Sequence, residues 1–160
     1  MTSFQLKSLS EVQRERLLDV PVYITLYVGV ADGTLDREEI EWSEHIAEFR
    51  AQQEDDLLGR YWSDVDRRFR RRFFQIRSEL GVVPDKEVSP MVVMQQIEAW
   101  FRGIPSAYPS LPEGWVVELY ESWRTYARQV ARASGGILGF GAVSGKEERA
   151  ILKIEKLLAP

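Results

Sequence analysis

The chain of 160 residues contains no cysteine and a single histidine, His45. Without cysteine it has neither disulfides nor a thiolate metal site, which suits a reducing compartment. The longest apolar run, residues 20–31, is shorter than the roughly 20 residues that span a bilayer. The N-terminus lacks the basic start and the small-residue cleavage site of a signal peptide. We therefore expect one soluble, cytoplasmic domain without a transmembrane segment.

The net charge of −4 conceals an asymmetry along the chain. Residues 32–56 hold ten acidic residues and two arginines, whereas residues 60–77 hold seven arginines and two aspartates. General nucleic-acid binding needs a broad basic surface, which this acidic chain lacks. The pattern leaves room for one local basic surface, and the predicted partner is another protein. Peripheral membrane association and the oligomeric state stay open.

Apolar residues recur at spacings of three and four, which predicts an all-α, single-domain bundle of about seven helices. Two serines predict a helix start, Ser8 with Glu11 three residues later and Ser10 with Gln13 three residues later, and Pro21 should break or kink that helix. Gly81 and Ser89-Pro90 mark a later end and start. The expected helices cover about residues 8–20, 21–30, 36–52, 54–80, 89–103, 110–133 and 144–158, with residues 104–112 as a loop.

The individual segments differ in the strength of this signal. Residues 22–30 are rich in β-branched and aromatic side chains, so periodicity alone would also allow a buried strand. Residues 54–80 carry the strongest amphipathic stripe. In residues 36–52 we assign five apolar side chains to the core face: Ile40, Trp42, Ile46, Ala47 and Phe49.

An acidic corner follows the longest apolar run. Asp32-Gly33 is a turn dipeptide, and Asp36 with Glu39 three residues later fits a helix cap with its reciprocal partner. The corner matches the second half of an EF-hand calcium loop, but Val28 and Val30 occupy the first two ligand positions. Valine supplies no carboxylate oxygen, so an EF-hand is excluded.

The motif Ala31-Asp32-Gly33, with Asp36 and Glu39 after it, resembles the tellurite-resistance TerB family and the related N-terminal domain of membrane-anchored DnaJ-like co-chaperones. A second copy is expected near the C-terminus, where residues 130–135 and 144–147 resemble it around a Gly-rich insertion. The resemblance implies two related helical hairpins that pack together. It also implies a non-enzymatic binding role linked to tellurite or chemical stress.

The resemblance further implies a divalent-cation site at the corner, with Asp32, Asp36 and Glu39 as ligands for calcium or magnesium. Three carboxylates near one turn repel one another, and a cation relieves that repulsion. With so few fixed ligands, binding should be no tighter than about millimolar. Helix capping and the turn explain the same three residues without metal, and this is the simpler interpretation. No other cofactor is expected.

Two catalytic or metal interpretations fail on spacing. Glu41, Glu44, His45 and Glu48 suggest a di-iron helix, but such sites use two Glu-x-x-His pairs and the chain has one histidine. The same shortage argues against a Ser-His-Asp hydrolase, and no enzymatic activity is expected. Residues 135–141 are rich in glycine but are not followed by the Gly-Lys-Ser/Thr of a phosphate loop.

The arginine run of residues 67–77 is the strongest candidate for a binding surface. Most of it is explained by a solvated helix face with i,i+4 pairs such as Asp64–Arg68 and Asp66–Arg70, worth about 0.2–0.5 kcal/mol each. Phe74 is not explained in this way, because the helical wheel places it outward with Arg67 and Arg71. The alternative function is therefore a protein-interaction module that binds an acidic partner through Arg67, Arg71 and Phe74.

Overall fold

The computed structural model describes residues 7–33, 37–53, 56–82, 89–134 and 145–160, all of them helical or in short connections. The described part contains no strand, and residues 22–30 are helical as expected. Its elements are α1 (Glu11–Asp32), α2 (Arg37–Gln53), α3 (Asp56–Glu79), α4 (Pro90–Arg102), the 3₁₀ helix η1 (Ile104–Ser110), α5 (Glu113–Ser134) and α6 (Gly145–Leu158).

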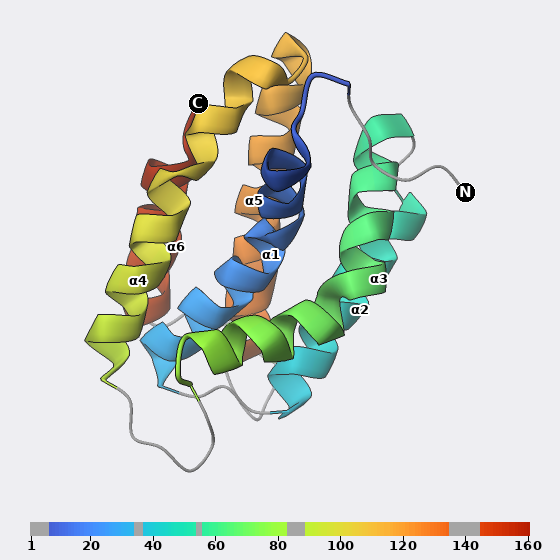
Figure 1. Cartoon of the computed structure of the whole chain (residues 1–160). Helices are drawn as coiled ribbons and strands as arrows, with labels where there is room; N and C mark the ends of the chain where they lie inside the picture. The colour runs from blue at the N-terminus through green and yellow to red at the C-terminus, as the bar shows by residue number, and fades with distance from the viewer. Residues whose placement is uncertain (1–6, 34–36, 54–55, 83–88, 135–144) are drawn as a thin grey trace.

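Helix α1 lies at the centre of the bundle (Figure 1). It packs against α3, α4, α5 and α6, and the view places α4 and α6 on one side with α2 and α3 on the other. An uninterrupted run from Leu17 to Val22 and a second from Ile24 to Gly29 are buried, so α1 is covered on every side. A helix that is apolar all round is a buried helix, which explains the long apolar run in the sequence.

Helix α1 continues through Pro21, and this corrects the expected count of about seven helices to six α-helices among the described residues. Proline lacks the N–H that would bond to the carbonyl four residues earlier, here that of Leu17. The hydroxyl of Tyr61 from α3 donates to this carbonyl at 2.6 Å and takes the place of the missing N–H. The indole N–H of Trp123 from α5 in turn donates to the Tyr61 hydroxyl at 2.8 Å. A tertiary contact thus stabilises the helix across its proline.

The expected caps agree with the structure at most helix ends. Ser10 and Gln13 form a capping box at the start of α1, and Gly33 ends that helix with φ 79°. Gly81, with φ 76°, follows α3. Ser89 precedes α4 with Pro90 as its first residue, but the Ser89 side chain forms no capping hydrogen bond. The expected loop at residues 104–112 contains η1 instead, since Pro105 and Pro109 permit a 3₁₀ helix while interrupting an α-helix.

The core assignments hold for α3 and fail in part for α2. In α3 the stripe of Trp62, Val65, Phe69, Phe73 and Ile76 is completely buried. In α2, Ile40, Ile46 and Ala47 are buried, whereas Trp42 and Phe49 are 53% and 60% exposed. Trp42 follows Ile40 by two residues and Phe49 follows Ala47 by two, which turns each aromatic about 200° away from the buried residue.

Helix α2 packs chiefly on α3, with α5 as its second neighbour, rather than folding back on α1. The expected packing of α1 and α2 as a helical hairpin is therefore not confirmed among the described residues. Helices α5 and α6 do pack on each other, and both pack on α1. This arrangement places the outer surfaces of α2 and α3 side by side.

Candidate functional site

The arginines of α3 divide into an inward and an outward set. Arg68 and Arg72 reach from α3 to Asp19 of α1, whose carboxylate is 5% exposed. Arg72 donates to both oxygens of Asp19, at 3.1 and 2.7 Å, and this hydrogen bonding raises the pKa of the Arg72 guanidinium. Sequence reasoning overlooked Asp19, because it lies in an apolar stretch. These two arginines join helices and are not available to a partner.

The i,i+4 pairs expected along α3 are replaced by other partners. Arg68 binds Asp19 and Glu15 of α1 rather than Asp64, and Arg70 binds Glu44 of α2 at 2.7 Å rather than Asp66. Arg67 binds the nearly buried Asp64, one helical turn before it. The long arginine side chains reach neighbouring helices, so tertiary packing decides their partners.

The outward set forms what we call the α3 face, made of Arg67, Arg71, Phe74 and Arg77. The side chain of Arg67 is 49% exposed, Arg71 is exposed, and Phe74 is 42% exposed. The guanidinium of Arg77 lies 4.8 Å from the centre of the Phe74 ring. The expected outward position of Phe74 is confirmed, and Arg77 joins the face because it lies one turn further along.

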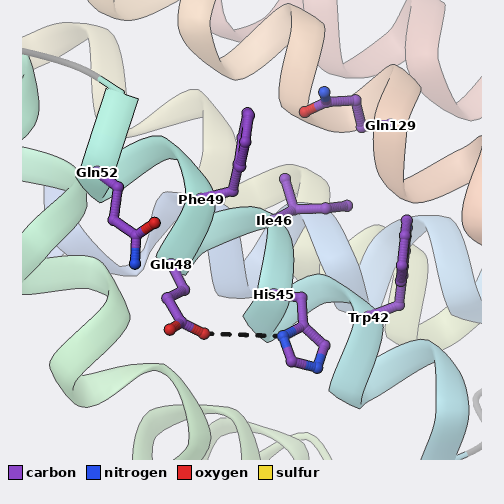
Figure 2. A pocket seen from close by; sticks show the side chains of 7 residues that line it. All are labelled: Trp42, His45, Ile46, Glu48, Phe49, Gln52 and Gln129. Carbon is purple, nitrogen blue, oxygen red and sulfur yellow. Dashed lines mark ion pairs between the residues drawn. The ribbon is translucent and has the colours of Figure 1, made fainter.

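A second exposed surface lies on α2 and was not expected from the sequence. We call it the α2 groove, a hollow of about 390 Å³ between α2 and the end of α5. Figure 2 shows Trp42, Ile46 and Phe49 on one side of α2, pointing toward the α5 ribbon that carries Gln129. Trp42 and Phe49 are seven residues apart, or about two helical turns. A helical wheel that compares them with Ile40 and Ala47 would have revealed this surface.

The solvent side of the α2 groove is acidic. Glu48 is 54% exposed and lies 3.7 Å from His45. Burial first, and then the charges of Glu48 and Glu44, raise the pKa of Asp66 on the adjacent helix α3. Glu44 is bound by Arg70 of α3, so one of these carboxylates is already compensated. Three carboxylates, those of Glu44, Glu48 and Asp66, therefore lie along the α2–α3 boundary, where Arg70 binds Glu44 and Arg67 lies near Asp66.

Arg50, the only cation in the second half of α2, is directed away from this acidic side. Its guanidinium donates to Gln129 at 2.7 Å and to Ser122 at 3.1 Å, both on α5. It also lies 5.1 Å from the centre of the Trp62 ring. Arg50 therefore fixes α2 against α5 and positions Gln129, which lines the groove.

The expected cation site is described only in part. Asp36 and the side chain of Glu39 lie outside the described residues, so their relation to Asp32 stays a prediction. Asp32 is partly buried at the end of α1 and lines a cavity of about 490 Å³. The same cavity is lined by three cations of α6, Lys146, Arg149 and Lys153, and by Glu98 of α4, which pairs with Lys153 at 3.5 Å. Repulsion from these cations would oppose a divalent cation beside Asp32, and the cation site stays a prediction.

The single histidine and the acidic side chains were further candidates for a metal site. No group of three or more His, Asp or Glu side chains among them is arranged to hold a metal ion. His45 is 70% exposed, with the carboxylate of Glu48 as its ion-pair partner. None of the described helices is both long and apolar enough to cross a membrane.

No family model matches the chain, and no curated protein or solved structure gives a significant match. The resemblance to the TerB family therefore rests on the residues of the two short motifs alone. Of the positions in those motifs, the structure describes residues 31–33, 130–134 and 145–147. Two exposed surfaces of the described residues, the α3 face and the α2 groove, have the properties of binding sites.

Proposed function

We propose that this chain is a non-enzymatic protein-binding domain that uses the α3 face to bind an acidic partner. The observation that carries the proposal is Phe74, a large aromatic side chain that is 42% exposed beneath the guanidinium of Arg77. Aromatic and arginine side chains dominate the energetics of protein interfaces. A buried interface would desolvate the Phe74 ring and strengthen its interaction with Arg77.

The chemistry of the partner follows from the charges of the α3 face. Arg71 is exposed and forms no ion pair with a described residue, so its guanidinium can receive a carboxylate of the partner. Arg67 already binds Asp64 and would share its remaining donors. We expect an acidic segment with an apolar residue that covers Phe74, bound most tightly at low salt because exposed charges are screened.

The experiment measures fluorescence anisotropy of labelled acidic peptides, each with one leucine or tryptophan among glutamates, against the wild-type protein and two variants. Arg71→Glu reverses an exposed charge, and Phe74→Ala removes the exposed ring. Arg67 is left unchanged, because a glutamate there would face the nearly buried Asp64 and destabilise the fold. We expect each variant to weaken binding by about tenfold, or about 1.4 kcal/mol, without a large change in Tm.

Two variants on other surfaces serve as matched controls. Arg132→Glu changes the net charge as Arg71→Glu does, at an exposed position of α5. Leu152→Ala removes an apolar side chain that is 52% exposed on α6. Equal losses from Arg71→Glu and Arg132→Glu would mean that only net charge attracts the peptide, and the proposed site would then be wrong.

A role in tellurite or chemical-stress response is supported only by the TerB resemblance, as are the two related hairpins around Asp32-Gly33 and residues 130–147. A weak calcium or magnesium site at Asp32, Asp36 and Glu39 belongs to the same proposal. The cations Lys146, Arg149 and Lys153 beside Asp32 weaken the metal part of it. Protein binding through the α3 face does not depend on that resemblance.

A further inference from the structure

The α2 groove combines exposed aromatic side chains with a defined hollow. A single exposed apolar residue elsewhere on the surface lacks this combination. Trp42 and Phe49 are 53% and 60% exposed, and Ile46 is 8% exposed between them at the base. The hollow of about 390 Å³ falls in the range of about 300–1,000 Å³ that is typical of binding pockets. Exposing two large aromatics to water is unfavourable, so a partner that covers them would gain hydrophobic free energy.

The shape of the groove fits a helix. Trp42 and Phe49 are two turns apart on one helix, a separation of about 10 Å. A partner helix that lies along α2 presents apolar side chains at i, i+3 or i+4, and i+7 over the same length. Gln129 of α5 forms the opposite wall (Figure 2). Arg50 holds Gln129 in place by donating a hydrogen bond at 2.7 Å.

The charges beside the groove select a partner of positive charge. Glu48 is exposed beside the groove, and Arg50 is occupied by α5. Burial first, and then the charges of Glu48 and Glu44, raise the pKa of Asp66, and Arg70 compensates Glu44. Among the described residues of α2 that line the groove, His45 is the single basic side chain, and it lies 3.7 Å from Glu48. A partner that brings lysine or arginine to this boundary would relieve the repulsion among the carboxylates.

We propose that the α2 groove binds a basic amphipathic helix of a partner protein, with apolar side chains against Trp42, Ile46 and Phe49 and basic side chains beside Glu48. This site is separate from the α3 face and has the opposite charge preference. The protein would then hold two partners, or two parts of one partner, through neighbouring helices.

The test uses two labelled synthetic helical peptides with the same leucine face. One carries lysine and arginine on its polar face, and the other carries glutamate. Anisotropy titrations should show that the basic peptide binds at least about tenfold more tightly than the acidic one at low salt. Equal binding of both peptides would overturn the charge argument, and no binding of the basic peptide would overturn the proposal.

Two variants locate the binding site. The double variant with Trp42→Ala and Phe49→Ala should bind the basic peptide about tenfold or more weakly than the wild type, and Glu48→Lys should bind it severalfold more weakly. The matched controls are Val117→Ala, which shortens a side chain that is 55% exposed on α5, and Glu118→Lys, an exposed charge reversal on the same helix. Equal effects of the α2 variants and their controls would overturn the proposal.

Further measurements separate the alternatives. Because Trp42 and Phe49 are exposed, their double variant should melt close to the wild type, and Glu48→Lys tests the same site without removing apolar area. Arg71→Glu should leave the basic peptide bound, so this proposal and that for the α3 face can fail independently. Light scattering tests whether the protein forms a dimer through the groove. A concentration-dependent dimer that is lost in the double variant with Trp42→Ala and Phe49→Ala would mean that the groove binds a second copy of the chain rather than a partner helix.

Discussion

Replacing Tyr61 by phenylalanine tests how α1 remains helical through Pro21. The substitution removes one oxygen that serves two buried groups. The hydroxyl donates to the Leu17 carbonyl at 2.6 Å and accepts from the Trp123 indole N–H at 2.8 Å. The Tyr61 side chain is completely buried, so water is not expected to replace either hydrogen bond.

The magnitude follows from the two groups that lose their partners. A buried donor or acceptor left without a hydrogen bond costs about 1–3 kcal/mol, so Tyr61→Phe should lower the free energy of unfolding by about 2–6 kcal/mol. In a chain of this length that corresponds to a loss in Tm of about 5–20 °C. Urea unfolding followed by far-UV circular dichroism gives the free energy, and the slope m should not change.

A double-mutant cycle with Pro21→Ala isolates the contribution of the carbonyl. Alanine restores the backbone N–H that the Leu17 carbonyl lacks, so Pro21→Ala should recover about 1–3 kcal/mol when Tyr61 is phenylalanine. It should help less in the wild type, where the Tyr61 hydroxyl already donates to that carbonyl. The coupling between the two sites should therefore exceed about 0.5 kcal/mol.

A control variant and one outcome test whether the Tyr61 hydroxyl stabilises α1 through the Leu17 carbonyl. Tyr23→Phe removes a half-buried hydroxyl from α1, for which no hydrogen bond to a described residue is found, and should cost less than about 1 kcal/mol. Additive effects of Tyr61→Phe and Pro21→Ala would refute the reasoning. The hydroxyl of Tyr61 would then stabilise the protein through Trp123 alone or through packing.

Three further predictions concern stability. Asp19→Asn removes the charge that Arg68 and Arg72 share at the α1–α3 contact, and should lower the free energy of unfolding by about 3 kcal/mol in urea titrations. Burial raises the pKa of all six tyrosines, that of Tyr23 to about 12. Because the pKa is raised in the folded state, the contribution to stability is fully present below the unfolded pKa of about 10 and is lost as the pH rises above it. Phenolate absorbance should therefore appear together with unfolding. A phenolate transition near pH 10 in a protein with native circular dichroism would contradict this. Several millimolar calcium or magnesium should raise Tm no more in the wild type than in Asp32→Asn, since three cations line the cavity beside Asp32; a rise confined to the wild type would restore the metal site.

Much of the candidate α3 face was accessible from the sequence. The stripe from Trp62 to Ile76 recurs at helical spacing, and once that stripe is buried, the wheel leaves Phe74 and Arg71 outward. The sequence could not show which arginines are available to a partner. Arg68 and Arg72 bind Asp19, which lies 49 and 53 residues away in the chain.

The α2 groove shows why apolar composition does not establish burial. Trp42 and Phe49 are as apolar as any core residue, yet α2 is covered by α3 and α5 on one side only. The positions of the partner helices determine which side of α2 is buried. Those positions depend on contacts such as Arg50 with Gln129, which join residues 79 positions apart.

The sequence by itself determined the all-helical class, most helix ends and the apolar stripes, because hydrophobic periodicity, caps and glycine turns act over a few residues. Only the tertiary structure decided that α1 continues through Pro21, since the hydroxyl that takes the place of the missing N–H comes from Tyr61, 44 residues from the carbonyl that it binds. It likewise decided which charges are paired and which aromatics are exposed. Local rules fix the helices, whereas exposed surfaces depend on how whole helices cover one another.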